Sequence, residues 1–267
     1  MPSVKTSDGI NINYSECGSG EPLILIMGLG APGGVWEKHI NEYKKRFRCI
    51  AIDNRGSGGS DKPGGDYTTK QMADDAVGVI DFLGMEKFHV SGISMGGAIA
   101  QHIAISRGSR VKSCVITASW AFCGEYMKNV FEMLKITRGN MSYGNFSRMF
   151  LLWLYSAKTY ENDFKTIEES FQNNIADLAP MNSHAFDSQA AACMSHDSRG
   201  KLEKITAPVL ITAGSKDIFT PLECSNYLHE NIKNSKLEIF SGYAHTHHWE
   251  DLENYNRLTS DFMNNNK

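Results

Sequence analysis

Short apolar runs alternate with amphipathic segments along most of this chain. The apolar runs, which are typical of buried strands, lie at residues 22–28, 48–56, 87–92, 111–119, 207–215 and 235–242. Segments with helical spacing of apolar residues follow them, at 34–47, 68–84, 95–108, 221–232 and 249–266. Strands that alternate with helices predict an α/β fold with a mostly parallel sheet covered by helices on both faces. In such sheets, ligands bind at the carboxyl ends of the strands.

The alternation stops between about residues 121 and 195, where no convincing strand is present. We interpret 121–195 as a helical cap inserted in a core made of 1–120 and 196–267. The alternative of two independent domains is less satisfactory, because neither the segment before the insertion nor the one after it would then contain a complete sheet.

A serine lies at the join between a predicted strand and a predicted helix, in the stretch GISMGG. Ser94 has Gly92 and Gly96 two positions away on either side, which is the spacing of a nucleophile elbow. Glycine is needed there because larger side chains would collide in so tight a turn. The alternative is a glycine-rich turn with an incidental serine.

An acid and a histidine follow in the order that such an elbow requires. Asp217 comes directly after the 207–215 strand, and His245 comes after the 235–242 strand. His245 is the expected general base and acid, and Asp217 is expected to hold its imidazole in the right tautomer. Asp217 could instead serve only as a helix N-cap, but that role does not explain its place in the order.

Two backbone N–H groups are needed to stabilise an oxyanion. We expect one from Met95 and the other from Leu29 in the glycine-rich loop MGLGAPGG. His247 and His248 follow the candidate base, but no Cys or carboxylate lies at a suitable ligand spacing, so we expect neither a metal site nor a cofactor.

Composition narrows the classes of protein. A net charge of −3 gives no sign of a nucleic-acid surface, and no run approaches the length of a membrane span. The N-terminus has no signal-peptide pattern. Six scattered cysteines without a C-x-x-C pair indicate reduced thiols, and therefore a cytoplasmic protein.

These motifs resemble those of the α/β-hydrolase superfamily along essentially the whole chain, and among its members small bacterial serine esterases and 3-oxoadipate enol-lactonase-like proteins. The matching pieces are GEPLILIMGLG, AIDNRGSGGSDKP, GISMGG, PVLITAGSKDIFTP and GYAHTHHWED. Two positions depart from the pattern: Met27 stands where many relatives have histidine, and Ala244 precedes the catalytic histidine where glycine-histidine is common. Epoxide hydrolases and haloalkane dehalogenases have an aspartate nucleophile, which Ser94 disfavours.

The resemblance implies hydrolysis of a small-molecule ester or lactone through an acyl-enzyme. Carbon–carbon bond hydrolases of ring-fission products are the main alternative, since Trp249-Glu250 matches a pair that they carry. In that family a cap arginine binds an acidic substrate, and the candidates here are Arg138 and Arg148. Carbamate hydrolysis, perhydrolysis and a triad-bearing receptor are further alternatives.

The predicted cap is rich in aromatic residues and methionine, which favours a small to medium apolar or aromatic acyl group. Trp120, after the fourth strand, and Phe219, beside Asp217, are the expected pocket walls. The sequence leaves the oligomeric state open.

Overall fold

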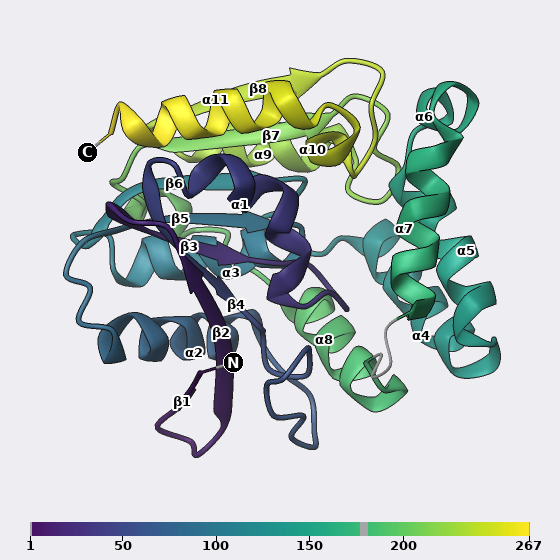
Figure 1. Cartoon of the computed structure of the whole chain (residues 1–267), viewed down its shortest axis with the longest axis horizontal. Coiled ribbons are helices and arrows are strands. Elements are labelled where there is room, and N and C mark those ends of the chain that lie inside the picture. The colour runs from purple at the N-terminus through teal and green to yellow at the C-terminus, as the bar shows by residue number, and fades with distance from the viewer. Residues whose placement is uncertain (1, 177–180, 267) are drawn as a thin grey trace.

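An eight-stranded sheet runs through the middle of the molecule (Figure 1). The computed structural model describes residues 2–176 and 181–266. The strands are β1 (Ser3–Lys5), β2 (Asn11–Cys17), β3 (Glu21–Ile26), β4 (Phe47–Ile52), β5 (Phe88–Ile93), β6 (Val111–Thr117), β7 (Val209–Gly214) and β8 (Ser235–Phe240). Their spatial order is β1-β2-β4-β3-β5-β6-β7-β8. β1 and β2 are antiparallel to their neighbours and the others are parallel, which confirms the predicted mostly parallel α/β sheet.

Helices bury both faces of the sheet. Successive side chains of a strand point to opposite faces, so each strand contributes to both apolar layers. In β3, Ile24 and Ile26 belong to one apolar cluster, and Leu23 and Leu25 belong to another. The first face is covered by α2 (Thr69–Phe82), α3 (Met95–Ser106) and α9 (Leu222–Asn231), and the second by α1 (Glu37–Tyr43) and α11 (Leu252–Asn264). Each buried Leu or Ile contributes roughly 1.5–3 kcal/mol, so these strands anchor the fold.

Local signals set the ends of α2 where the sequence predicts them. Thr68 accepts a hydrogen bond from the Gln71 N–H, and the Gln71 side chain accepts one from the Thr68 N–H. This capping box satisfies two backbone donors of the first helical turn. Gly84 follows the helix with a φ of 66°, a conformation in which a side chain would be strained.

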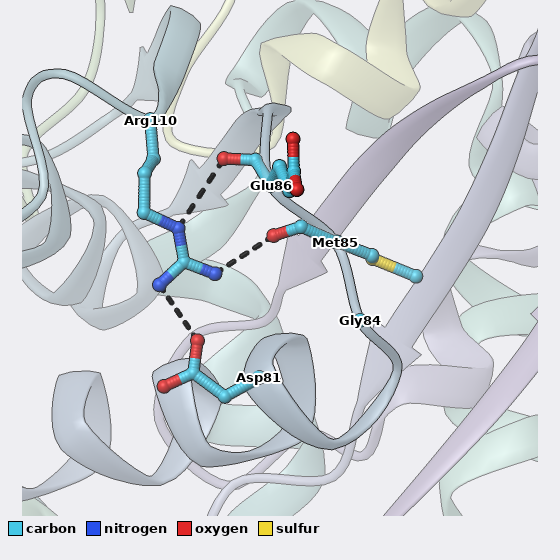
Figure 2. Close-up of a pocket in the computed structure, with 5 residues that line it drawn as sticks. All are labelled: Asp81, Gly84, Met85, Glu86 and Arg110. Carbon is cyan, nitrogen blue, oxygen red and sulfur yellow. Dashed lines mark hydrogen bonds and ion pairs between the residues drawn. The ribbon is translucent and has the colours of Figure 1, made fainter.

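Arg110 stabilises the end of the sheet at which β6 begins (Figure 2). Its guanidinium donates to the carbonyls of Met85 and Glu86 and pairs with the Asp81 carboxylate at 2.6 Å. These bonds tie the turn after α2 to the turn before β6. Because this cluster lies at the amino ends of the strands, it stabilises the scaffold at the end opposite Ser94.

A helical insertion separates β6 from β7, at the right of Figure 1. Its helices are α4 (Glu125–Asn140), α5 (Tyr143–Leu154), α6 (Ala157–Asn162), α7 (Phe164–Ala176) and α8 (Ser183–Ser195). Residues 177–180 of the stretch lie outside the described residues. The two ends of the insertion are joined, since the Ser198 N–H donates to the Ala121 carbonyl at 2.8 Å.

The structure differs from the predicted elements in a few places. The strands β1 and β2 precede the first predicted one, and they pair with each other along Ser3–Lys5 and Asn11–Asn13. The predicted 34–47 helix begins as a 3-10 turn, Gly33–Trp36, and ends at Tyr43 because β4 starts at Phe47. The last helix is interrupted at Asp251, so that α10 (His247–Glu250) precedes α11.

No helix among the described residues is long and apolar enough to cross a membrane. All six cysteines are free thiols, four of them buried.

Candidate active site

Ser94 occupies a strained turn between β5 and α3. Its φ of 57° and ψ of −118° are unusual for a residue with a side chain. A Cβ added to Gly92 would collide with the Gly96 carbonyl, and one added to Gly96 would collide with the Ile26 carbonyl. The glycines are therefore required by close backbone approach, and the turn has the geometry of a nucleophile elbow.

His245 and Asp217 lie after neighbouring strands and are hydrogen-bonded to each other. The His245 Nδ1 is 2.8 Å from the Asp217 Oδ2, and both side chains are almost completely buried. The Phe219 and Thr220 N–H groups each donate to the Asp217 Oδ1 at 2.8 Å, and the Thr220 hydroxyl donates to Oδ2 at 2.7 Å. Four donors thus fix the carboxylate and orient the imidazole.

Ser94 and His245 line the same cavity, which has a volume of about 560 Å³. This size is typical of small-molecule sites. Between them the structure forms no hydrogen bond, and in ligand-free sites such contacts are often long. The arrangement places the Ser94 hydroxyl after β5, the buried Asp217 carboxylate after β7 and the His245 imidazole after β8, all at the carboxyl ends of the strands.

The loop after β3 passes directly over Ser94. A Cβ on Gly28 would lie 3.1 Å from the Ser94 Cβ, and Leu29 lines the cavity. Within the described part of the chain, the N–H groups of Leu29 and Met95 donate to no protein acceptor. Both expected oxyanion donors are therefore available beside the candidate nucleophile.

Two side chains that the sequence did not single out brace this loop. Gln189 in α8 accepts a hydrogen bond from the Gly30 N–H at 2.9 Å and donates to the Arg55 carbonyl at 2.8 Å. Asn54 donates to the Met27 carbonyl at 3.0 Å. The loop is thus held through the Met27 backbone and from the helical insertion, although Met27 itself offers no polar side-chain support.

A continuous series of aromatic rings forms one wall of the cavity. Phe219 packs edge-on against His245 with ring centroids 4.9 Å apart, and Phe150 contacts Phe219 at 5.9 Å. Phe146 follows, in contact with Phe150 at 5.6 Å and with Phe186 at 5.4 Å. All of these rings line the cavity, and all except Phe219 come from the helical insertion.

Trp120, the other expected wall residue, lies elsewhere. Its ring is fully buried and packs against Phe131 and His196, and it does not belong to the cavity lining. The residue comes after the end of β6, where the chain turns toward the insertion, so its side chain enters the core beneath α4 instead of the cavity.

The two histidines that follow the candidate base have separate environments. His247 is buried between the Ala244 carbonyl and the Thr212 hydroxyl. His248 lines the cavity and contacts His39. In the described ranges, no group of three or more His, Cys, Asp or Glu residues is placed to hold a metal ion.

Glu250 connects the His245 loop to the helical insertion. Its Oε1 accepts hydrogen bonds from the Ser156 N–H and hydroxyl and from the Thr159 hydroxyl. Its Oε2 accepts from the Ala244 N–H at 2.9 Å and more weakly from the Thr246 hydroxyl at 3.4 Å. The Trp249-Glu250 pair noted in the sequence therefore includes a residue that supports the site.

The chain belongs to the α/β hydrolase fold family, whose profile matches residues 21–252. It is 27% identical over 248 residues to a putative carbamate hydrolase, RutD, of Azorhizobium caulinodans, covering 92% of this chain and 91% of that one. It is 28% identical over 263 residues to the 2-hydroxy-6-oxo-6-phenylhexa-2,4-dienoate hydrolase of Comamonas testosteroni, covering 94% and 91%. Among solved structures, an esterase from Exiguobacterium antarcticum superposes with a TM-score of 0.88 at 26% identity, covering 98% of both chains.

Proposed function

We propose that this α/β hydrolase is a serine enzyme that cleaves small to medium apolar or aromatic carboxylic esters or lactones. The observation that carries the proposal is the strained Ser94, which lines the same cavity as His245, itself bonded to Asp217 at 2.8 Å. The esterase of similar structure supports the ester reaction.

Acylation follows from the orientation of the histidine. Because the Asp217 carboxylate can only accept, the His245 Nδ1 carries the proton and Nε2 is free to take the Ser94 proton. The Ser94 Oγ then attacks the carbonyl carbon, and the oxyanion is stabilised by the N–H groups of Leu29 and Met95. His245 returns its proton to the leaving alkoxide as the C–O bond breaks, which leaves an acyl group on Ser94.

Deacylation repeats these roles with water as the nucleophile. His245 takes a proton from the water, which attacks the acyl carbon, and gives it back to the Ser94 oxygen as the acid leaves. For a lactone, the alcohol and the acid are parts of one product. Asp217, held by four donors, stabilises the imidazolium formed in both halves of the reaction.

The cavity wall supports the choice of acyl group. The aromatic series from Phe219 to Phe186 provides apolar surface next to His245, where an acyl chain or ring can be buried.

Carbon–carbon bond hydrolysis is a second candidate, favoured by the position of Arg138. Arg138 lines the cavity and donates to the Met181 carbonyl at 2.8 Å, and within the described residues it has no carboxylate partner. Arg148 is instead paired with Glu168 at 2.6 Å and lies outside the cavity lining. Arg138 is therefore the residue to bind an acidic ring-fission product, such as that named for the Comamonas testosteroni relative.

A substrate panel separates the two candidates. We expect p-nitrophenyl esters from acetate to octanoate to be hydrolysed with a preferred acyl length, and Ser94→Ala to lower kcat by on the order of 10⁶. Ser106→Ala, an exposed change at the other end of α3, is the matched control. Consumption of a phenyl-substituted ring-fission acid without ester turnover would replace the ester proposal with carbon–carbon cleavage.

A further inference from the structure

A second histidine contributes to the cavity wall, and the proposed reaction leaves it without a role. His248 lies in α10, is 1% exposed and lines the cavity, together with Lys38 and Trp249. A buried polar ring in the cavity wall is costly unless its nitrogen atoms form hydrogen bonds.

One nitrogen of His248 belongs to a buried chain of hydrogen bonds. The Asn256 Oδ1 is 2.6 Å from the His39 Nδ1, and the His39 Nε2 is 3.1 Å from the His248 Nδ1. The three side chains come from α11, α1 and α10. His39 is completely buried, and the ring of Tyr255 packs against both histidines, so these hydrogen bonds lie within the core.

The direction of these hydrogen bonds follows from the amide oxygen at their start. An amide oxygen only accepts, so the proton of His39 is on Nδ1. A neutral imidazole has one N–H, so the His39 Nε2 accepts and the His248 Nδ1 donates. The His248 Nε2 then carries no proton and presents a lone pair.

Burial keeps both rings neutral. It lowers the pKa of His39 to about 4 and holds the pKa of His248 well below its usual value of 6.5. Positive charge at His39, His247 or His245 would lower the pKa of His248 further. The tautomer set by Asn256 therefore persists at neutral pH.

The remaining atom, the His248 Nε2, has no hydrogen-bond partner among the described residues. It is also not one of the fully buried side-chain polar atoms that lack a partner. We propose that the His248 Nε2 is a fixed hydrogen-bond acceptor of the cavity, which selects substrates that carry a hydroxyl or an N–H donor. The inference rests on the proposed function, because it names the class of ester or lactone that this site takes: one with an apolar acyl portion for the aromatic wall and one donor group for His248.

Matched pairs of substrates test the acceptor directly. 2-Hydroxyethyl and 2-methoxyethyl butanoate place or remove a donor on the alcohol side, and methyl 6-hydroxyhexanoate and methyl 6-methoxyhexanoate do so on the acyl side. We expect the hydroxyl member of at least one pair to have a kcat/KM about tenfold higher, the effect of one net hydrogen bond. The preference should fall to about one in His248→Phe and remain in His229→Phe, an exposed histidine in α9.

Equal kcat/KM values within both pairs in the native enzyme would overturn the proposal, and so would a preference that survives His248→Phe. If Ser94 reacts with esters in general, either result leaves the proposed function standing. An enzyme that hydrolyses none of the four esters contradicts the proposed function instead.

A binding measurement tests the acceptor even if the enzyme hydrolyses none of these esters or if His248→Phe does not fold. In ¹⁵N-histidine-labelled Ser94→Ala protein, the His248 Nε2 should resonate as an unprotonated nitrogen and shift on addition of the hydroxyl ester that reaches it, but not of its methoxy partner. A protonated Nε2, or the same response to both members of each pair, would show that His248 is not the acceptor.

Discussion

Replacing Glu250 by glutamine tests whether the helical insertion positions His245, the proposed catalytic histidine. The carboxylate accepts hydrogen bonds from α6 and its N-cap residue Ser156 on one oxygen, and from the residues on either side of His245 on the other. Thr246 is also bonded directly to the insertion, since its N–H and hydroxyl both donate to the Leu154 carbonyl. The His245 loop is therefore attached to two points of the insertion.

The size of the effect follows from the number of donors around Glu250. A glutamine amide has one accepting oxygen, so its NH₂ group must face donors at one of the two sites. If the oxygen stays with Ser156 and Thr159, the bond from the Ala244 N–H to a charged acceptor, worth about 1.5–3 kcal/mol, is lost. For a chain of this size, a loss of about 2 kcal/mol lowers Tm by roughly 4–8 °C.

The loss of activity should exceed what the stability change explains. Ala244 flanks His245, and a small displacement of a catalytic group is costly, so we expect kcat to fall by about tenfold or more with a smaller change in KM. Calorimetry and p-nitrophenyl butanoate kinetics measure the two effects. Glu253→Gln, an exposed change three residues further on, is the control. If Glu250→Gln matches that control in both Tm and kcat, Glu250 does not position the loop.

Two further predictions concern the pH dependence of stability and the loop over Ser94. Burial lowers the pKa of five histidines below the unfolded value of about 6.5; these are His39, His102, His196, His247 and His248. The unfolded chain thus binds more protons between about pH 4 and 6.5, so Tm should fall steeply as the pH drops from 7 to 5, and a flat profile would contradict this burial. Gln189→Leu leaves the partly buried Gly30 N–H unpaired and should lower kcat severalfold at an unchanged acyl-length preference; an unaltered kcat would show that the loop needs no brace from α8.

Strong hydrophobic periodicity made most of the fold predictable. Strands such as β3, buried on both faces, appear in the sequence as unbroken apolar runs. The missed strand β2 reads NINYSEC, in which only Ile12 and Tyr14 are buried, because it lies near the antiparallel edge of the sheet. Its short and mostly polar alternation is a weaker signal than the buried parallel strands provide.

The residues near Ser94 were predictable where a strand end fixes their position. Ser94, Asp217 and His245 each follow a strand, and parallel strands bring their carboxyl ends to one edge. Supporting contacts have no such marker: His39 and His248 are 209 positions apart, and Glu250 meets Ser156 only because α6 docks there. Trp120 shows the limit of the rule, since it follows a strand and yet points into the core.

The most direct test of the account is covalent labelling of the proposed nucleophile with a fluorophosphonate, followed by intact-mass measurement and peptide mapping. We predict one adduct per chain, located at Ser94, and none in Ser94→Ala protein that remains folded. Labelling should slow when a p-nitrophenyl ester competes for the cavity. An unlabelled native protein, or an adduct that persists in Ser94→Ala, would contradict the assignment of Ser94 as the nucleophile.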